Sequence, residues 1–294
     1  MSVDEPRGAT DRVAYEVEVD PGMVDWASDV LWSAGASAVA ELAADDGVRV
    51  RLVADLDPGA VSDLPFEVVR PTTADLAEED ALDAWRAHAM VWRAGDHVVV
   101  RPPWLDADLG PGDVVVVVDP GHSFGSGSHP TTRLCLAEVE RLVARGDRAI
   151  DLGCGSGVLG TAALMLGAAS LVAVDLDPAA VAATQEVLRA NHLTSRASVL
   201  LAALSSTQLA TVLAAEGPFD LVVANLLLPV LVGHASVIAS MVAPDGHLIV
   251  SGVLESQRAT AEVALVGARP GLDRSRIARI DDWVAMAFTY HGPP

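Results

Sequence analysis

Short apolar runs alternate with segments of helical character from about residue 149 to the end of the chain. Apolar runs of about four to eight residues bounded by turn signals predict buried strands. In chain order the predicted strands are 149–152, 171–174, 198–202, 219–224, 247–251, 277–280 and 284–290. Helices are predicted over 158–166 and 178–191. This alternation predicts an α/β fold: a Rossmann-like, doubly wound sheet of seven strands.

The first 71 residues have a different pattern. Residues 15–19 alternate apolar and polar side chains, as a half-exposed strand does. One helix is predicted from Pro21 to about residue 33, and a second short helix at Asp57-Pro58. Further strands are predicted at 38–42, 48–53 and 66–69. The resulting β-α-β-β-α-β order predicts a small, ferredoxin-like α+β domain.

A segment of mixed character joins these two regions. Residues 72–93 begin acidic and continue with an apolar face, which predicts a connecting helix. Residues 98–101 and 114–118 predict a pair of strands. We therefore expect three parts, with the boundaries 1–71, 72–118 and 119–294.

A glycine-rich turn follows the predicted strand 149–152. Gly153, Gly155 and Gly157 alternate there and lead into a helix. Glycines let the backbone approach a ligand closely, and the amides at the start of the helix face that ligand. The next strand ends at Asp175, whose carboxylate can accept hydrogen bonds from both hydroxyls of a ribose. The pattern indicates a site for a nucleotide-like cofactor.

The cofactor itself is not decided by the glycines. The segment from Gly155 to Gly160 fits G-x-G-x-x-G with an acid about 20 residues further on, as in NAD-binding folds. Asp151 just before the glycines completes D-x-G-x-G-x-G instead, which is typical of class I methyltransferases that use S-adenosyl-L-methionine (SAM). A tight turn without any ligand is the third interpretation. The two well-placed acids disfavour it, and Asp151 favours SAM over NAD.

Charge narrows the choice of partners. The net charge is −21, and all 19 basic side chains are arginine. Nucleic-acid binding relies on neutralising phosphates with Lys and Arg, so direct binding of nucleic acid is not expected. A basic protein remains a plausible partner through electrostatic steering.

Cysteines and hydropathy bear on location. Cys135 and Cys154 form neither a disulfide framework nor a metal-binding spacing, which fits a reduced, cytoplasmic setting. The polar residues 1–12 contain no signal-peptide core. The uncharged stretches 152–174 and 221–244 each divide into a strand and a helix. We therefore expect no membrane span.

A second informative stretch runs from Asp119 to Thr132. It is rich in Gly, Ser and Pro and precedes a helix, so it can fold over a ligand. The hydroxyls of Thr131 and Thr132 can cap that helix or bind a polar ligand group. A metal pair of His122 and His129 is disfavoured because no third ligand stands at a recognisable spacing. No metal is predicted.

Four motifs together resemble the PrmA family, the methyltransferases of the eleventh large-subunit ribosomal protein. They are Phe-Gly-Ser-Gly-Ser-His-Pro-Thr-Thr (124–132), Asp-Leu-Gly-Cys-Gly-Ser-Gly (151–157), Asp-Leu-Asp-Pro (175–178) and Asn-Leu-Leu (225–227). Their order and spacing also match. Ser126 and Ser128 replace the threonines usual in the family. The resemblance covers roughly residues 78–260, and over the first 71 it rests on domain size and position.

The resemblance implies a SAM-dependent protein N-methyltransferase. Its targets would be lysine side-chain and/or N-terminal amino groups of that ribosomal protein. Residues 1–71 would recognise the substrate, and 119–294 would form the catalytic domain. The implied SAM contacts are Thr132, Gly153, Asp175 and Asn225, and the glycine-loop argument adds Asp151, Gly155 and Gly157.

Asn225, at the end of the strand 219–224, is the predicted catalytic residue. Methyl transfer from a sulfonium requires alignment of acceptor and methyl group, and the acceptor amine must be unprotonated. The side-chain carbonyl of Asn225 can orient that amine. No dedicated base stands out, although His129 and His234 are possible. The alternatives are a methyltransferase of the same build acting on another protein's lysine or a small amine, an NAD-dependent oxidoreductase, and a SAM-binding regulator without turnover.

Overall fold

The computed structural model describes residues 13–19, isolated positions between 27 and 36, 39–43, 49–72 apart from 66 and 69, 90–119 and 129–292. The chain divides into two compact units, Met1–Ala89 and Met90–Pro294. Each unit is described by itself below.

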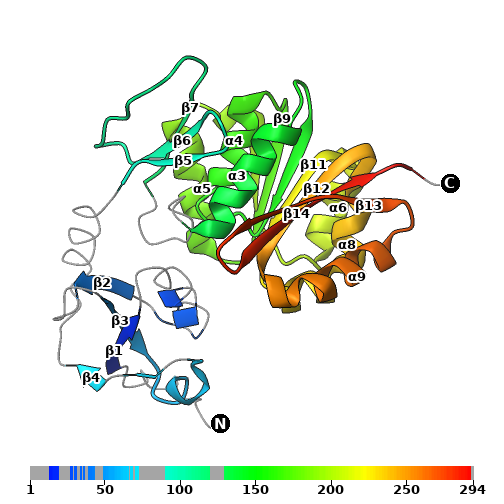
Figure 1. The fold of residues 1–294 in the computed structure, drawn as a ribbon. Coiled ribbons are helices and arrows are strands. Elements are labelled where there is room, and N and C mark those ends of the chain that lie inside the picture. The colour runs from blue at the N-terminus through cyan, green and yellow to red at the C-terminus, as the bar shows by residue number, and fades with distance from the viewer. Residues whose placement is uncertain are drawn as a thin grey trace, which may run out of the picture. The chain divides into compact units, whose positions relative to one another are not determined.

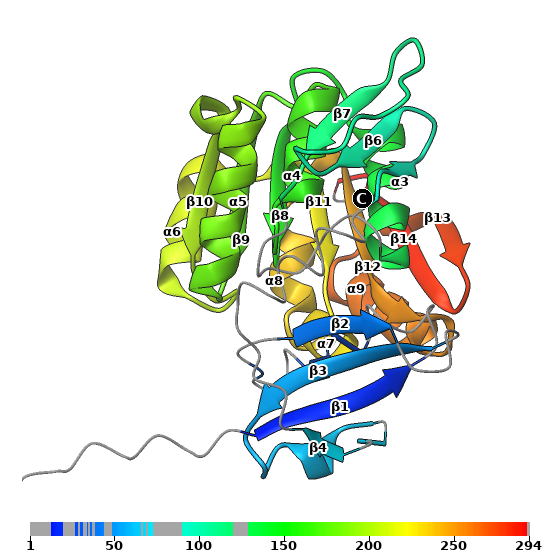
Figure 2. The ribbon, with the colours of Figure 1, turned by 90° about the vertical axis from the view of Figure 1, so that its left-hand side faces the viewer.

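The N-terminal unit contains one antiparallel sheet in the order β2-β3-β1-β4 (Figure 2). Its elements are β1 (Val13–Val19), β2 (Val39–Ala43), β3 (Val50–Leu56), the 3-10 turn η2 (Val61–Asp63) and β4 (Arg70–Thr72). The first and third strands lie in the middle, as a ferredoxin-like domain requires. Alternate residues of β1 and β3, Val17 and Leu52 among them, are buried in its core.

Two predictions for this unit were wrong. Residues 67 and 68 of the strand expected at 66–69 are not in a strand, and β4 follows at 70–72, where it pairs with residues 14–16 of β1. Pro71 is tolerated there because β4 is an edge strand. The helix expected at Asp57-Pro58 is only the short turn η2. Most of the helix expected from Pro21 and the connecting helix after residue 72 lie outside the described residues.

The second unit is built on a seven-stranded sheet in the order β10-β9-β8-β11-β12-β14-β13 (Figure 2). The strands are β8 (Arg148–Leu152), β9 (Ser170–Asp175), β10 (Ala197–Leu201), β11 (Phe219–Asn225), β12 (Val242–Leu254), β13 (Leu272–Ile280) and β14 (Trp283–Tyr290). Neighbours are parallel except β14, which runs antiparallel to both β12 and β13. All seven predicted strands are present. Five have ends within one residue of the prediction, whereas β12 and β13 each begin five residues earlier than predicted and β12 ends three residues later.

Helices cover both faces of this sheet (Figure 1). One face carries α3 (Pro130–Leu142), α4 (Val158–Leu166) and α5 (Pro178–Ala190). The other carries α6 (Thr207–Glu216), α7 (Leu228–Gly233), α8 (Ala235–Ser240) and α9 (Arg258–Ala268). Successive strand residues such as Ile150 and Ala149 therefore point into different cores. None of the helices that the structure describes is long and apolar enough to cross a membrane.

The sequence did not predict α6 and α9. Leu209 is the one buried residue of α6, and Ala261 and Leu265 are those of α9. So narrow a buried face leaves little helical periodicity to detect.

A small sheet of β5 (Trp92–Ala94), β6 (Val98–Arg101) and β7 (Val114–Val117) packs against α3 and α4. Glu140 on α3 accepts the backbone N–H groups of Asp96 and His97 at 2.8 and 2.9 Å. The side-chain amide of Asn191 binds both the N–H and the C=O of Val117, at 2.9 and 2.7 Å. These contacts make the small sheet part of the second unit.

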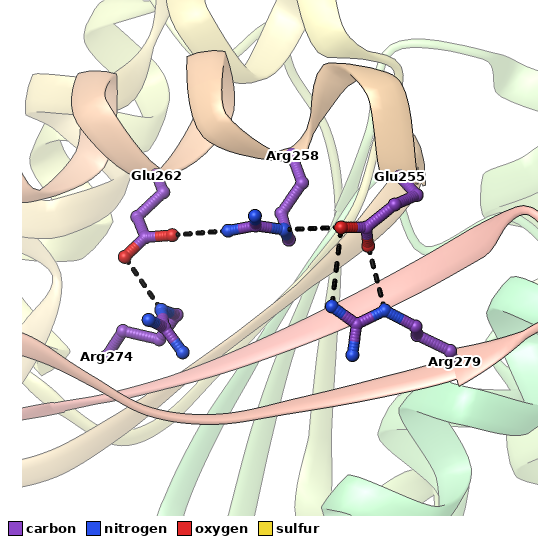
Figure 3. Close-up of polar contacts among 5 residues, drawn as sticks. All are labelled: Glu255, Arg258, Glu262, Arg274 and Arg279. Atoms are coloured by element: carbon purple, nitrogen blue, oxygen red, sulfur yellow. Dashed lines mark hydrogen bonds and ion pairs between the residues drawn. The ribbon is translucent and has the colours of Figure 1, made fainter.

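The edge strand β13 is joined to α9 by a chain of ion pairs (Figure 3). Glu255 binds Arg258 and Arg279, each at 2.9 Å. Glu262 binds Arg258 at 3.0 Å and Arg274 at 2.7 Å. Exposed pairs contribute little singly, but a connected network restricts geometry. Charged side chains on an edge strand also disfavour pairing with other chains.

Candidate active site

The predicted site residues gather at the carboxyl ends of the central strands. Asp151 lies near the end of β8, Asp175 ends β9 and Asn225 ends β11. These three strands are neighbours in the parallel part of the sheet, with Leu152 paired to both Val174 and Ala224. Ligands of open α/β sheets bind at this edge.

The glycine turn after β8 has a backbone that favours glycine. The φ angles of Gly153, Gly155 and Gly157 are 70°, 53° and 79°, all in the left-handed region. A Cβ on Gly157 would lie 2.8 Å from Cγ2 of Thr184, so only glycine fits there. Gly157 is also the N-cap of α4 and has no side chain of its own to cap the helix. The N–H of Gly160 is bound by Asp151, so the amides of Val158 and Leu159 are the ones in the first turn that can face a ligand.

Asp175 is held in place by two backbone amides. Its Oδ2 accepts the N–H of Gly155 at 3.0 Å, and its Oδ1 accepts the N–H of Asp177 at 3.0 Å. A carboxylate oxygen has two lone pairs, so each retains capacity for a ligand hydroxyl. The neighbouring side chains of Leu176 and Leu201 are 76% and 48% exposed. They offer apolar surface beside the carboxylate and were not singled out from the sequence.

Asp151 lies beneath the glycine turn and is buried. Its Oδ2 accepts the N–H of Gly160 at 3.0 Å, which links β8 to α4. Its Oδ1 has no hydrogen-bond partner among the described residues. Burial raises the pKa of Asp151 to about 7, and the charge of Asp175 adds to the rise. The carboxyl group supports the turn from below, and a direct contact with a cofactor stays a prediction.

The raised pKa of Asp151 has a consequence for stability. Its folded-state value of about 7 lies above the ordinary 3.8. The contribution of Asp151 to the free energy of unfolding is therefore fully present below about pH 4, where the carboxyl group is protonated in both states. It is lost as the pH rises to about 7, because the unfolded chain then ionises more readily than the folded protein. We expect Asp151→Asn, which cannot ionise, to flatten this part of the profile. Denaturant unfolding of both proteins across this range tests it, and parallel profiles would refute it.

Asn225 is oriented by a short chain of hydrogen bonds. The N–H of Thr131 donates to Nδ1 of His129 at 3.2 Å, so this nitrogen carries no proton. The hydroxyl of Thr131 then donates to the same nitrogen, at 2.6 Å, and its oxygen accepts from Nδ2 of Asn225 at 3.2 Å. Burial lowers the pKa of His129 to about 4, which agrees with a neutral imidazole. The amide nitrogen of Asn225 is thereby assigned to the side that faces Thr131, and the oxygen to the other side.

That oxygen is the most informative atom of the site. Oδ1 of Asn225 is buried and finds no hydrogen-bond partner in the described part of the chain. Leaving a buried polar atom unpaired costs about 1–3 kcal/mol. An acceptor left open beside the glycine turn is suited to a ligand that donates N–H or O–H.

The structure decides which residue caps α3 and where the two histidines considered as bases lie. His129, and neither threonine, caps α3, because its Nδ1 accepts the N–H of Thr131. Thr132 is buried in the first turn of α3. The imidazole of His129 is buried and packs edge-on to Trp283 at 4.9 Å, while Nδ1 of His234 contacts the carbonyl of Val230. Neither histidine is therefore placed as a base.

Neither metal binding nor catalysis by a nucleophilic thiolate is supported by the described residues. No group of three His, Cys, Asp or Glu side chains there could hold a metal ion. Burial raises the pKa of the Cys154 thiol, which disfavours a nucleophilic thiolate. His122 and the segment 124–128 lie outside the described residues. The contact between Thr131 and Asn225 joins residues far apart in the chain, and no sequence signal predicted it.

The strand order and the glycine turn define a class. A seven-stranded sheet whose last-but-one position is an antiparallel strand, with a glycine turn after the first strand of its parallel part in chain order (β8), is the fold of class I SAM-dependent methyltransferases. Residues 60–291 match the family model described as ribosomal protein L11 methyltransferase (PrmA). The chain belongs to this family.

Individual relatives and one solved structure also place the chain in this family. The chain is 38% identical to a ribosomal protein L11 methyltransferase of Geobacter sulfurreducens, over 76% of this chain and 70% of that protein. It is 36% identical to one of Chloroflexus aurantiacus, over 94% of this chain and 97% of that protein. The crystal structure of a ribosomal protein L11 methylase from Lactobacillus delbrueckii subsp. bulgaricus superposes with a TM-score of 0.60 at 28% identity. It covers 69% of this chain and 99% of that one.

Proposed function

We propose that this protein is a SAM-dependent protein N-methyltransferase acting on ribosomal protein L11. Its targets are lysine side-chain and/or N-terminal amino groups. Membership of the family and the names of the relatives support the substrate. The single observation that carries the chemistry is the open acceptor oxygen of Asn225 beside the glycine turn. A ribosomal substrate also favours a cytoplasmic location.

The residues around the glycine turn fit SAM. The turn at Gly153, Gly155 and Gly157 would seat the methionine part of the cofactor through its left-handed backbone and the first amides of α4. Asp175 retains acceptor capacity for the two ribose hydroxyls, and Thr132 lies in the first turn of α3. Bound SAM supplies a methyl group activated by its sulfonium. Asp151 acts indirectly in this arrangement, by holding the turn in shape.

Asn225 acts on the acceptor. Oδ1 accepts an N–H from the incoming amine and aims the nitrogen lone pair, while Nδ2 is occupied by Thr131. The amine must arrive without its extra proton, because an ammonium has no lone pair. A partly desolvated site lowers an amine pKa, so the proton leaves to solvent before transfer.

The direct test is mass spectrometry of L11 after incubation with this protein and isotopically labelled SAM. The chain contains no lysine, so every methyl-lysine detected comes from the substrate. Labelled lysine or N-terminal amine in L11 is the expected result. Label on a different protein or on a small amine would favour a methyltransferase of the same build with another target. SAM binding without any transfer would favour a regulator. NAD binding in place of SAM would favour an oxidoreductase.

The proposal also assigns the parts of the chain. The N-terminal domain recognises L11, and the segment from residue 119 onward carries catalysis. The net charge of −21 favours a basic partner and disfavours direct contact with nucleic acid.

Asp175→Ala is expected to weaken SAM binding. The variant leaves the ribose hydroxyls without their acceptor, at a cost of about 1–3 kcal/mol, which is roughly five- to hundredfold in Kd. Isothermal titration calorimetry measures this. Asp177→Ala is the matched control, because Asp177 caps α5 through the N–H of Ala179 at 2.9 Å. It loses stability and keeps SAM affinity. Equal affinities in wild type and Asp175→Ala would remove Asp175 from the site.

A further inference from the structure

Leu226, the residue after Asn225, lies between Gly252 of β12 and Gly153 of the glycine turn after β8. Gly252 lies in β12 at the point where its pairing with β14 is irregular, and its φ is +82°. A Cβ there would lie 2.7 Å from the carbonyl carbon of Leu226 and 2.9 Å from its nitrogen, and closer still to its oxygen. These are backbone atoms, which cannot rotate away. Any side chain at position 252 would therefore displace the segment that carries Asn225.

The second glycine is on the cofactor side. A Cβ on Gly153 would collide with Cδ2 at the end of the Leu226 side chain. The side chain of Leu226 thus lies over the glycine turn, while its backbone lies against β12. One residue therefore spans the gap between the strand that carries the acceptor-orienting amide and the turn that seats the cofactor.

The strand behind Leu226 is itself firmly held. The N–H of Leu226 donates to the carbonyl of Ser251 at 3.1 Å, and Asn225 pairs with Ser251 in the sheet. The buried hydroxyl of Ser251 donates to the carbonyl of Val284 at 2.8 Å. Because this hydrogen bond anchors Ser251 to β14, we expect a clash at Gly252 to be relieved by movement of Leu226 and Asn225.

We infer that Gly252 and Leu226 are positioning residues for methyl transfer: together they set the separation between Asn225 and the glycine turn. This inference rests on the proposed role of Asn225. Neither residue touches the reacting atoms. A displacement of about 1 Å at a reacting group costs about a hundredfold in rate. The cofactor contacts of Asp175 lie on another strand and remain intact, so transfer is lost while SAM binding is kept.

Gly252→Ala tests this in the full-length protein, with kcat on L11, SAM affinity and Tm as readouts. We expect kcat to fall about a hundredfold, with SAM affinity close to that of wild type. The matched control is Gly146→Ala. Gly146 has a φ of +99° and nothing within 4 Å of an added Cβ, so it carries the backbone strain without the collision. It is expected to lower Tm and leave kcat unchanged.

Leu226 provides a second variant in case Gly252→Ala does not fold. Leu226→Ala removes the side chain over Gly153 and is expected to lower kcat, whereas Leu226→Met keeps the volume and restores most of it. Wild-type kcat in Gly252→Ala or in Leu226→Ala would overturn the inference, and so would an equal loss of kcat in Gly146→Ala. Asn225→Ala distinguishes a failure of the proposed role of Asn225 from a failure of the positioning inference. If it is fully active, the proposed role of Asn225 fails. If it is inactive while Gly252→Ala is active, only the positioning inference fails.

Discussion

Asn225→Ala is expected to lower kcat for methylation of L11 about a hundredfold, because the acceptor amine loses the group that aims it. Stability is expected to change little. Asn225 does not cap the following helix, since Leu227 is the N-cap of α7 without a side-chain bond. The variant loses one hydrogen bond, from Nδ2 to the hydroxyl of Thr131, which is worth about 1 kcal/mol. Single-turnover rates and thermal unfolding, measured side by side, test this.

Asn225→Asp distinguishes orientation from packing. The carboxylate has nearly the same shape but places a negative charge beside the acceptor, which raises the pKa of the amine and favours the unreactive ammonium. A slow enzyme whose rate recovers in part at higher pH is therefore expected. A pH profile identical to that of wild type would contradict this explanation.

Thr131 offers an independent check on the same amide. Thr131→Ser keeps the hydroxyl that receives Nδ2 of Asn225 and is expected to stay active. Thr131→Val removes that hydroxyl and frees the amide to flip, which is expected to lower kcat with little effect on SAM affinity. Equal rates in the two variants would show that the amide is held by other contacts.

Deletion of the N-terminal unit is expected to abolish methylation of L11 while leaving SAM binding intact. The glycine turn, Asp175 and Asn225 all belong to the unit Met90–Pro294, which contains both cores of the large sheet. Its SAM affinity, measured by calorimetry, is therefore expected to match that of the full chain. In the proposed assignment, this deletion removes the contacts that bring the substrate amine to Asn225.

The control is the isolated N-terminal unit, which is expected to bind L11 without methylating it. Methylation of L11 at the full rate by Met90–Pro294 would rule out recognition by the N-terminal unit. Loss of SAM binding in the truncated protein, with circular dichroism showing a folded sheet, would show that the cofactor site needs both units.

The sequence predicted the structure well where a single short segment contains all the residues that determine its conformation. The glycines at 153, 155 and 157 require left-handed backbone whatever surrounds them, and Asp177-Pro178 starts α5 with a cap and a proline that act within one turn. The apolar runs of β8, β9 and β11 are buried on both faces, so their composition alone predicted them. These segments were enough to predict the fold class and the position of the cofactor loop.

The remaining features depend on contacts between segments far apart in the chain. The register that places β4 at 70–72 is decided by its partner β1, and α6 and α9 are held by one or two buried residues each. The hydrogen bond that makes the oxygen of Asn225 the free acceptor comes from Thr131 on α3. The close approach of Leu226 to Gly252 exists only because β11 and β12 lie side by side. The sequence by itself determined which residues form the strands and the cofactor turn, because those choices depend on local conformation and burial. Only the tertiary structure decided how Asn225 is aimed, because that depends on α3 and β12 packing against the end of β11.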